Sequence, residues 1–418
     1  MTTFRATGSA LLLAWLAGTG LAAQDSLRPP EGVRVGIEYR PGHRPALVVL
    51  PGPGNDSVRR ILSRDLDYSD RFEVITLPAD TTPPLNPAPP LNVALWRSLG
   101  ATFAVGLRPD GNGLVVQVWD VVAGLSKREE RIVLPAPADA GFRLAVHRLA
   151  DEIVRWITGT PGAAASQLLF VVDRTLHRID SDGAGLTRVS PPGEQVLSPV
   201  WSPDGSRIAY TRFGQGAGSI VLQATVGGPP ATLTGTGSAL NITPAFSPDG
   251  RLLAFARAGE EGTDIFVADV AQNCCVQRLT VGRYADNLSP TFAPDGRHVG
   301  FVSTRAGLPQ IYVMAADGTD QELLAPFDYG ATGSSNAPEW SPDGASVVFH
   351  REVNRSPQVF VVDAASRKVR QLTSAGGNED PTWAPDGRHL AFVSDRSGQR
   401  QLWVIDTMTG RIRQLTFL

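Results

Sequence analysis

The sequence predicts an α/β N-terminal domain followed by an all-β domain with the fold of a six-bladed β-propeller. Two observations carry this prediction. A seven-residue box recurs five times in the second half of the chain, and an amphipathic helix closes a mixed α/β pattern in the first half. The chain has 418 residues, of which 42% are hydrophobic and 19% charged, so it has enough apolar surface for folded cores. This length fits two or three domains.

The repeated box reads Pro-x-aromatic-Ser/Ala-Pro-Asp-Gly, and consecutive copies start 43 to 48 residues apart. Pro-Asp-Gly favours a hairpin turn, because Pro fixes φ, Asp can bond its own backbone and Gly accepts a left-handed conformation. The box aspartates are therefore interpreted as turn formers and not as catalytic or calcium-binding residues. The five copies occupy residues 199–205, 244–250, 290–296, 338–344 and 381–387.

Short apolar strands follow each box. In the second copy they lie at 252–255, 265–267 and 278–280, the last with an Arg-Leu-Thr pattern. Together with the aromatic strand around the box, they make four strands per repeat, which is the content of a propeller blade. Residues 168–189 repeat the last three strands without a box. Five full blades and one partial blade therefore predict a ring of six.

Residues 24–160 predict a small α/β domain, and residues 161–418 form the predicted propeller. We expect the helix near residue 58 to be capped by Asp56 or Ser57, and the last helix to stop at Gly159. The expected elements are strands at 33–37, 46–50, 102–106 and 114–118, helices at 58–66, 92–99 and 142–157, and a proline-rich loop at 83–90.

Residues 1–23 have the pattern of a cleaved secretory signal peptide, with Arg5, an apolar run and small residues before a polar segment. The run is shorter than the roughly 20 apolar residues of a membrane-spanning helix. No cysteine lies near the cleavage region, so no lipoprotein anchor is expected. The adjacent Cys274 and Cys275 are interpreted as two small residues at a hairpin, with a vicinal disulfide as the alternative.

No catalytic, metal-binding or cofactor-binding residues are predicted. The sequence has no Gly-x-Ser-x-Gly elbow. His298 and His389 follow their boxes at the same offset, so they lie in different blades and are not placed to share a metal. The segment 51–54 lacks the Lys-Ser/Thr of a P-loop and is interpreted as a turn. The balance of 38 basic and 41 acidic residues argues against nucleic acid, and the scattered arginines are interpreted as a compositional bias.

Together, these residues resemble the TolB family of the Tol-Pal envelope system. The boxes are shared with many propellers, and three further segments make the resemblance more specific. They are residues 64–72 (RDLDYSDRF), 96–106 (WRSLGATFAVG) and 147–162 (HRLADEIVRWITGTPG). Family members often end with one more aromatic-Ser-Pro segment that closes the first blade. This chain lacks it, so ring closure is expected to use a different strand or none.

The resemblance implies a non-enzymatic, monomeric protein of the periplasm, peripheral to the membrane through its protein partners. It implies that the propeller binds the outer-membrane lipoprotein Pal at its channel mouth. It also implies that the mature N-terminal strand binds TolA of the inner membrane, here through Val33, Val35 and Ile37. The expected role is to support outer-membrane integrity and constriction at cell division.

The repeat itself indicates which residues surround the channel mouth. In a propeller, the loops that lead into the innermost strands open at one end of the channel, and Asn recurs there just before the boxes. Its amide suits a polar protein partner, while a structural role in the turn is the alternative. The predicted docking residues are Asn241, Thr243, Asp286, Asn287, Ser289, Asn336, Asn378 and Asp380.

Two other functions stay open from the sequence. One is a generic exported propeller scaffold that binds another envelope protein or a glycan. The other is an enzyme with a site in the channel, which would need converging histidines and carboxylates. The identity of the partner that binds the mature chain would distinguish the TolB-like role from the generic scaffold. The metal content of the purified protein would test the enzyme.

Overall fold

A computed structural model describes residues 44–52, 54–76, 91–214, 217–234, 239–272, 274–326 and 333–418, all of which belong to one compact unit. The expected signal peptide, the strand at 33–37 with Val33, Val35 and Ile37, and the loop at 83–90 lie outside these residues. None of the described helices is both long enough and apolar enough to cross a membrane.

The first domain is built on a five-stranded mixed sheet with the order β2-β1-β3-β4-β5. β1 (Ala46–Val49) runs parallel to β2 (Glu73–Val74) and to β3 (Phe103–Asp110). β4 (Gly113–Asp120) and β5 (Leu125–Ile132) continue the sheet with antiparallel pairing. The strands at 46–50, 102–106 and 114–118 are thus confirmed, within a few residues of their predicted ends.

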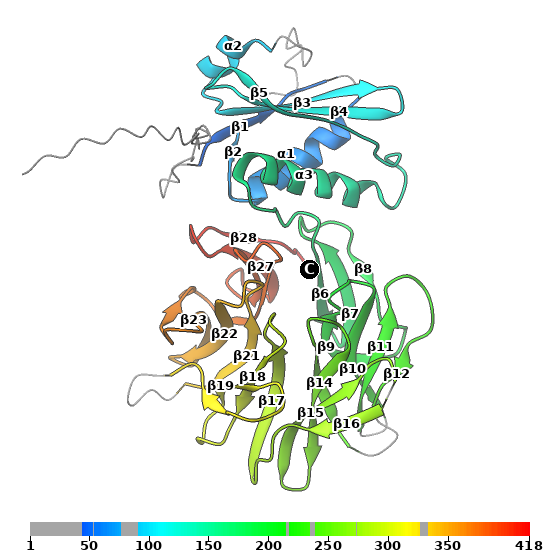
Figure 1. Cartoon of the computed structure of the whole chain (residues 1–418), viewed down its shortest axis with the longest axis vertical. Coiled ribbons are helices and arrows are strands. Elements are labelled where there is room, and N and C mark those ends of the chain that lie inside the picture. Colours follow the sequence, from blue (N-terminus) through cyan, green and yellow to red (C-terminus); the bar gives the residue numbers. More distant parts are fainter. Residues whose placement is uncertain are drawn as a thin grey trace, which may run out of the picture. The chain divides into compact units, whose positions relative to one another are not determined.

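Two helices share one core with this sheet. α1 (Asp56–Tyr68) buries the predicted apolar face, and α3 (Phe142–Thr158) packs beside it in the same cluster (Figure 1). The short α2 (Val93–Ser98) contributes Trp96 to a separate cluster that contains Val48 and Trp119. Side chains alternate between the two sides of a strand, so the two clusters fill opposite faces of the sheet.

The helix ends confirm one predicted signal and correct another. α3 stops at Gly159, which has a φ of 79°, as expected of a glycine that ends a helix. α1 is preceded by Asn55 and not capped by Asp56 or Ser57. The Asn55 side chain donates to the carbonyl of Leu107 at 3.0 Å, so this residue ties the helix start to β3.

The sequence patterns missed β5. This strand carries Lys127, Arg128, Glu129, Glu130 and Arg131 in a row, and it has no apolar alternation to reveal it. It lies at the edge of the sheet and is largely exposed, where charged side chains protect a strand from unwanted pairing.

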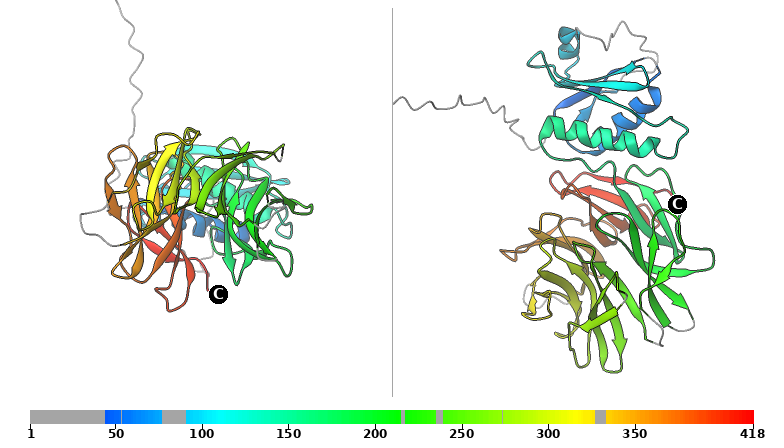
Figure 2. Two further views of the ribbon diagram at one scale, coloured as in Figure 1. Left: turned by 90° about the horizontal axis from the view of Figure 1, so that it is seen from below. Right: turned by 45° about the vertical axis from the view of Figure 1, so that its right-hand side comes forward.

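From Gln167 onward the described chain forms antiparallel sheets in the order of the sequence (Figures 1 and 2). The first, β6-β7-β8, has three strands, and each later repeat has four. β15 and β17 also pair through two residues, so the strands from β13 to β20 form one continuous sheet. The strands are β6 (Gln167–Val172), β7 (Thr175–Asp180), β8 (Thr187–Arg188), β9 (Gln195–Trp201), β10 (Arg207–Gly214), β11 (Ala217–Ala224), β12 (Ala231–Thr232), β13 (Asn241–Phe246), β14 (Leu252–Gly259), β15 (Gly262–Asp269), β16 (Cys274–Arg278), β17 (Ala285–Phe292), β18 (His298–Ser303), β19 (Gln310–Ala315), β20 (Glu322–Leu323), β21 (Ser335–Trp340), β22 (Ser346–Val353), β23 (Ser356–Asp363), β24 (Val369–Gln371), β25 (Asn378–Trp383), β26 (His389–Ser394), β27 (Gln401–Asp406) and β28 (Ile412–Gln414).

The boxes form the predicted turns. All five box glycines have φ values between 64° and 72°, and each box aspartate accepts a backbone N–H two residues further on. Where the box contains Ser, its hydroxyl donates to the aspartate. Where it contains Ala, a histidine three residues after the aspartate takes that place, namely His298 or His389. The turn-forming interpretation of the aspartates is confirmed.

Successive sheets pack face to face through apolar side chains. Tyr210 lies in the cluster between the first two repeats, and Phe301 and Phe349 lie in clusters between later ones. The first sheet packs on the last one, where Ile179 meets Leu402 and Leu415. Face packing therefore joins the two ends of the series. The predicted number of six blades stays a prediction.

The cysteine pair lies at β16. Cys275 is disulfide-bonded and has a φ of 63°. The interpretation of two unbonded residues at a hairpin was therefore wrong for Cys275.

Candidate functional site

Each innermost strand of the five box repeats contains the same irregularity. The residue directly before the box proline has a φ between 49° and 52°, and the pairing with the next strand shifts there. Because this β-bulge recurs in every box repeat, it belongs to the architecture of the blade and not to one site. The residues in this conformation are Ser198, Thr243, Ser289, Ala337 and Asp380.

Three of the predicted docking asparagines are buried. Asn241, Asn287 and Asn378 are each at most 1% exposed. Their amides donate to acceptors of the preceding repeat, for example from Asn287 Nδ2 to Asp264 Oδ1 at 3.1 Å and from Asn378 Nδ2 to Gln358 Oε1 at 2.9 Å. These amides are used within the propeller, an observation that favours the structural alternative for these three residues.

Arginines complete the same arrangement. Arg305 donates to Asn287 Oδ1 at 3.1 Å, and its guanidinium lies 4.8 Å from the ring centre of Tyr312 and 5.4 Å from that of Phe301. Arg257, Arg351 and Arg396 repeat this stacking on the aromatic pairs of their own sheets. The sequence interpretation of the arginines as a compositional bias gave them no role, and at these four positions they have a structural one. They lie 13 or 15 residues after the first residue of their boxes, a recurrence that could have revealed them.

The other predicted docking residues are less buried. Thr243, Asp286, Ser289 and Asn336 are partly exposed, and the side chain of Asp380 is 70% exposed. Thr243 and Asp286 also accept internal hydrogen bonds, from Ser289 N and Thr263 N. Of the predicted residues, Asp380 is the most accessible to a partner.

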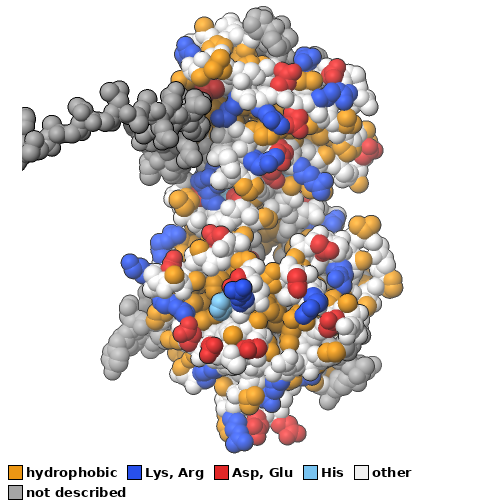
Figure 3. All heavy atoms as spheres, in the orientation of Figure 1, with side chains coloured by type: hydrophobic (Ala, Val, Ile, Leu, Met, Phe, Trp, Pro, Cys, Tyr) orange, Lys and Arg blue, Asp and Glu red, His pale blue; other side chains and the backbone are white. Residues whose placement is uncertain are grey.

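An exposed aromatic residue lies at the same end of the sheets and was not predicted. Tyr284 directly precedes β17, is 88% exposed and has a φ of 57°. Its backbone N–H donates to the carbonyl of Glu261, in the turn between β14 and β15, at 2.7 Å. Val281, in the same loop, is 76% exposed. Figure 3 shows one face of the molecule, over which hydrophobic and charged side chains are interspersed.

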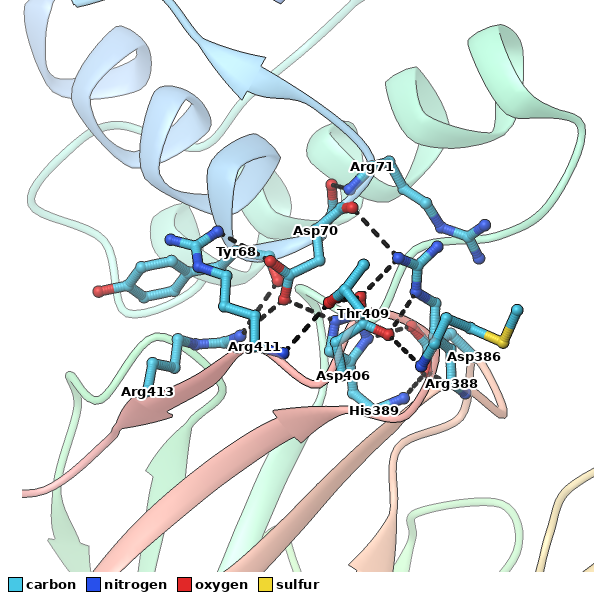
Figure 4. Close-up of polar contacts among 12 residues, drawn as sticks. Tyr68, Asp70, Arg71, Asp386, Arg388, His389, Asp406, Thr409, Arg411 and Arg413 are labelled. Carbon is cyan, nitrogen blue, oxygen red and sulfur yellow. Dashed lines mark hydrogen bonds and ion pairs between the residues drawn. The ribbon is translucent and has the colours of Figure 1, made fainter. Parts of the chain in front are cut away.

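The other end of the sheets, where the box turns lie, contacts the α/β domain. Asp70 follows α1, has a φ of 54° and a side chain that is 1% exposed. Its carboxylate receives Arg411 Nη1 at 2.8 Å and faces His389 Nε2 at 3.2 Å, while its backbone carbonyl accepts Arg388 Nη2 at 3.2 Å (Figure 4). Arg413 lies over the ring of Tyr68. We call this group of residues the Asp70 contact.

Burial acts to raise the pKa of Asp70, but the bonds from His389 and Arg411 outweigh it and hold this pKa below its usual range. Asp386, the box aspartate beside His389, shows the same balance, with a pKa lowered to about 2. Both carboxylates are therefore ionised at neutral pH.

A second polar contact joins α1 and α3 to the first propeller sheet. Asp182 lies in the turn between β7 and β8, and its side chain is 1% exposed. Its carboxylate pairs with Arg64 and, at 2.5 Å, with Arg143 Nη2. His147 Nδ1 lies 2.6 Å from Asp65 Oδ2 within the α/β domain. We call this group the Asp182 contact. Asp65 lies on the buried face of α1. A carboxylate at such a position was the sequence signal that could have revealed the polar contact.

Comparisons with known proteins agree with this architecture. The model of the TolB beta propeller domain family matches residues 154–330 and 328–418. The Tol-Pal system protein TolB of Methylococcus capsulatus is 34% identical over 189 residues, which are 42% of this chain and 44% of that protein. Its counterpart from Albidiferax ferrireducens is 34% identical over 174 residues, 38% and 39% of the two chains. The matched region thus spans less than half the length of these relatives.

The crystal structure of TolB from Acinetobacter baumannii has the same fold. Its TM-score is 0.76 at 24% sequence identity, and the match covers 90% of this chain and 94% of that one. The fold and the two polar contacts define a β-propeller protein that carries an α/β domain. The chain belongs to the TolB family.

Proposed function

We propose that this protein is the non-enzymatic docking component of a Tol-Pal envelope system. In this proposal it acts in the periplasm after removal of residues 1–23, and its propeller is a six-bladed ring. The propeller binds a Pal-like outer-membrane lipoprotein, and the segment with Val33, Val35 and Ile37 binds a TolA-like protein. Through these partners the protein would support outer-membrane integrity and constriction at cell division. Membership of the TolB family and the names of the curated relatives support a role in the Tol-Pal system.

The proposed docking site is based on the exposed loop that leads into β17. Tyr284 presents its ring to solvent from a left-handed backbone, which is an uncommon position for a bulky residue. Aromatic side chains of this kind are enriched among the residues that dominate protein interfaces. Asp380 and the partly exposed Asp286 begin innermost strands at the same end of the sheets, so the proposed surface combines an aromatic anchor with acidic groups.

Binding of the mature chain to the soluble domain of the Pal-like lipoprotein from the same organism tests this surface. We expect Tyr284→Ala to weaken binding by roughly tenfold or more. Met408→Ala is the matched control, because Met408 is 67% exposed but lies in the turn between β27 and β28, at the other end of the sheets. Equal affinities of the two variants would contradict the proposed surface. Retention of a different envelope partner would favour the generic scaffold.

A further inference from the structure

His389 lies between two carboxylates from different domains. Its Nδ1 is 2.6 Å from Asp386 Oδ2 in its own hairpin, and its Nε2 is 3.2 Å from Asp70 Oδ2 in the α/β domain (Figure 4). The histidine side chain is 6% exposed, and the side chains of Asp70 and Asp386 are 1% and 3% exposed. Water therefore has little access to this arrangement.

The two carboxylates determine which form of the imidazole fits. Asp70 also receives the guanidinium of Arg411, and Asp386 also receives the backbone N–H groups of Arg388 and His389, so both act as hydrogen-bond acceptors. An ionised carboxylate only accepts hydrogen bonds. Neutral imidazole carries one N–H and would turn a lone pair toward one of the two carboxylates. Imidazolium donates to both.

His298 shows what the same position does without the second carboxylate. It follows its box at the same offset as His389, and its Nδ1 contacts Asp295 at 3.0 Å. Its side chain is 51% exposed. The histidine–aspartate pair of the hairpin therefore forms without any contact to the α/β domain, and the bond to Asp70 is the feature that distinguishes His389.

We propose that docking of the α/β domain on the last propeller sheet requires the protonated form of His389, so that acid strengthens the Asp70 contact and alkali weakens it. The charged groups around the imidazole come from both domains. Asp67, Asp70 and Arg44 belong to the α/β domain, and Arg44 Nη1 lies 3.5 Å from Asp70 Oδ1. Those of the propeller are Asp386, Arg388, Asp406, Arg411 and Arg413.

The direction of the pH dependence of docking follows from the balance of these charged groups. Burial acts to lower the pKa of His389, but the bonds to Asp386 and Asp70 outweigh it, and the net pKa is raised above that of an ordinary histidine. A group whose pKa is raised on docking stabilises the docked state fully at low pH, and this stabilisation is lost as the pH rises through the raised value. Since Asp386 stays beside His389 when the domains separate, only the part of the shift that Asp70 causes is linked to docking. One proton changes the docking equilibrium by at most about tenfold per pH unit.

Hydrogen exchange of the mature chain tests the proposal, with the peptide covering residues 64–72 as the reporter. After correction for intrinsic exchange, we expect its protection in the wild type to fall by about tenfold between pH 6 and pH 9. His389→Gln should show the low protection already at pH 6. His298→Gln, which loses the same hairpin bond, should behave like the wild type. His147 Nε2 lies 3.8 Å from Asp182 Oδ2, so a second histidine lies beside a contact between the domains. The pH response assigned to His389 is therefore only the part that His389→Gln abolishes.

A second measurement needs no variant. With histidine labelled by ¹⁵N, more than half of His389 in the wild type should carry two protonated ring nitrogens at pH 6.5, at which an ordinary histidine is half protonated. A neutral imidazole at this pH, or equal protection of residues 64–72 in His389→Gln and the wild type at pH 6, would overturn the proposal.

Discussion

Glu339 Oε1 accepts the backbone N–H of Trp383 at 3.0 Å, and this bond joins the innermost strands of two successive sheets, β21 and β25. Two other links also run from a side chain of one repeat to the innermost strand of the next. Thr243 Oγ1 accepts Ser289 N, and His350 Nδ1 accepts Asp380 N, both at 3.2 Å. Side chains of one repeat thus bond to N–H groups at the inner edge of the next repeat.

Glu339→Gln should stabilise the protein at alkaline pH. Burial raises the pKa of Glu339 to about 7, although bonds from Thr382 and Trp383 favour its ionised form. A carboxyl whose pKa is raised on folding binds more protons in the native state, so its ionisation lowers stability as the pH rises from about 4.5 to 7. Gln keeps the acceptor without the charge. We expect a gain of about 1–3 kcal/mol in the free energy of unfolding at pH 8 and little change at pH 4.5, measured with urea. An equal gain in the free energy of unfolding at pH 8 and at pH 4.5 would contradict the attribution of the effect to the ionised carboxylate of Glu339.

Asn287→Ala should destabilise the fold. The substitution leaves Arg305 and Asp264 without one of their buried partners, which costs about 1–3 kcal/mol in the free energy of unfolding. Asn336→Ala is the control, because Asn336 is only partly buried, and we expect a change within about 0.5 kcal/mol. Urea unfolding at pH 7 measures both variants, and equal stabilities would show that burial of the amide has no energetic role.

Asp182→Asn should weaken the Asp182 contact. The neutral amide cannot compensate the charges of Arg64 and Arg143, and its NH₂ group donates where acceptors are needed. We expect a loss of about 2–3 kcal/mol in the free energy of unfolding. The control is Asp317→Asn, at an exposed turn residue whose Asn replacement keeps the turn. If Asp182→Asn were as stable as this control, the ion pairs would contribute nothing to folding.

The local features were predictable because they depend on neighbouring residues. Pro-Asp-Gly determines its own turn, and Val58, Ile61, Leu62 and Leu66 reveal their helix by spacing alone. β5 was not predictable in this way, because an exposed edge strand needs no apolar alternation.

The site was less predictable than the fold. The loop positions before the boxes lie at one end of the sheets as expected, but sequence alone did not distinguish a buried side chain from an exposed one. Asn287, three residues before its box, is fully buried, while Asp380, one residue before its box, is exposed. The bond between His389 and Asp70 joins residues 319 positions apart, so no local pattern could indicate it.

The packing of Ile179 on Leu402 and Leu415 has a consequence for how the chain folds. These partners lie more than 200 residues apart in the sequence. The cluster cannot form before Leu402 and Leu415 have been synthesised, and contacts of such long sequence separation form slowly. The first propeller sheet therefore keeps this apolar face uncovered until the last sheet is present.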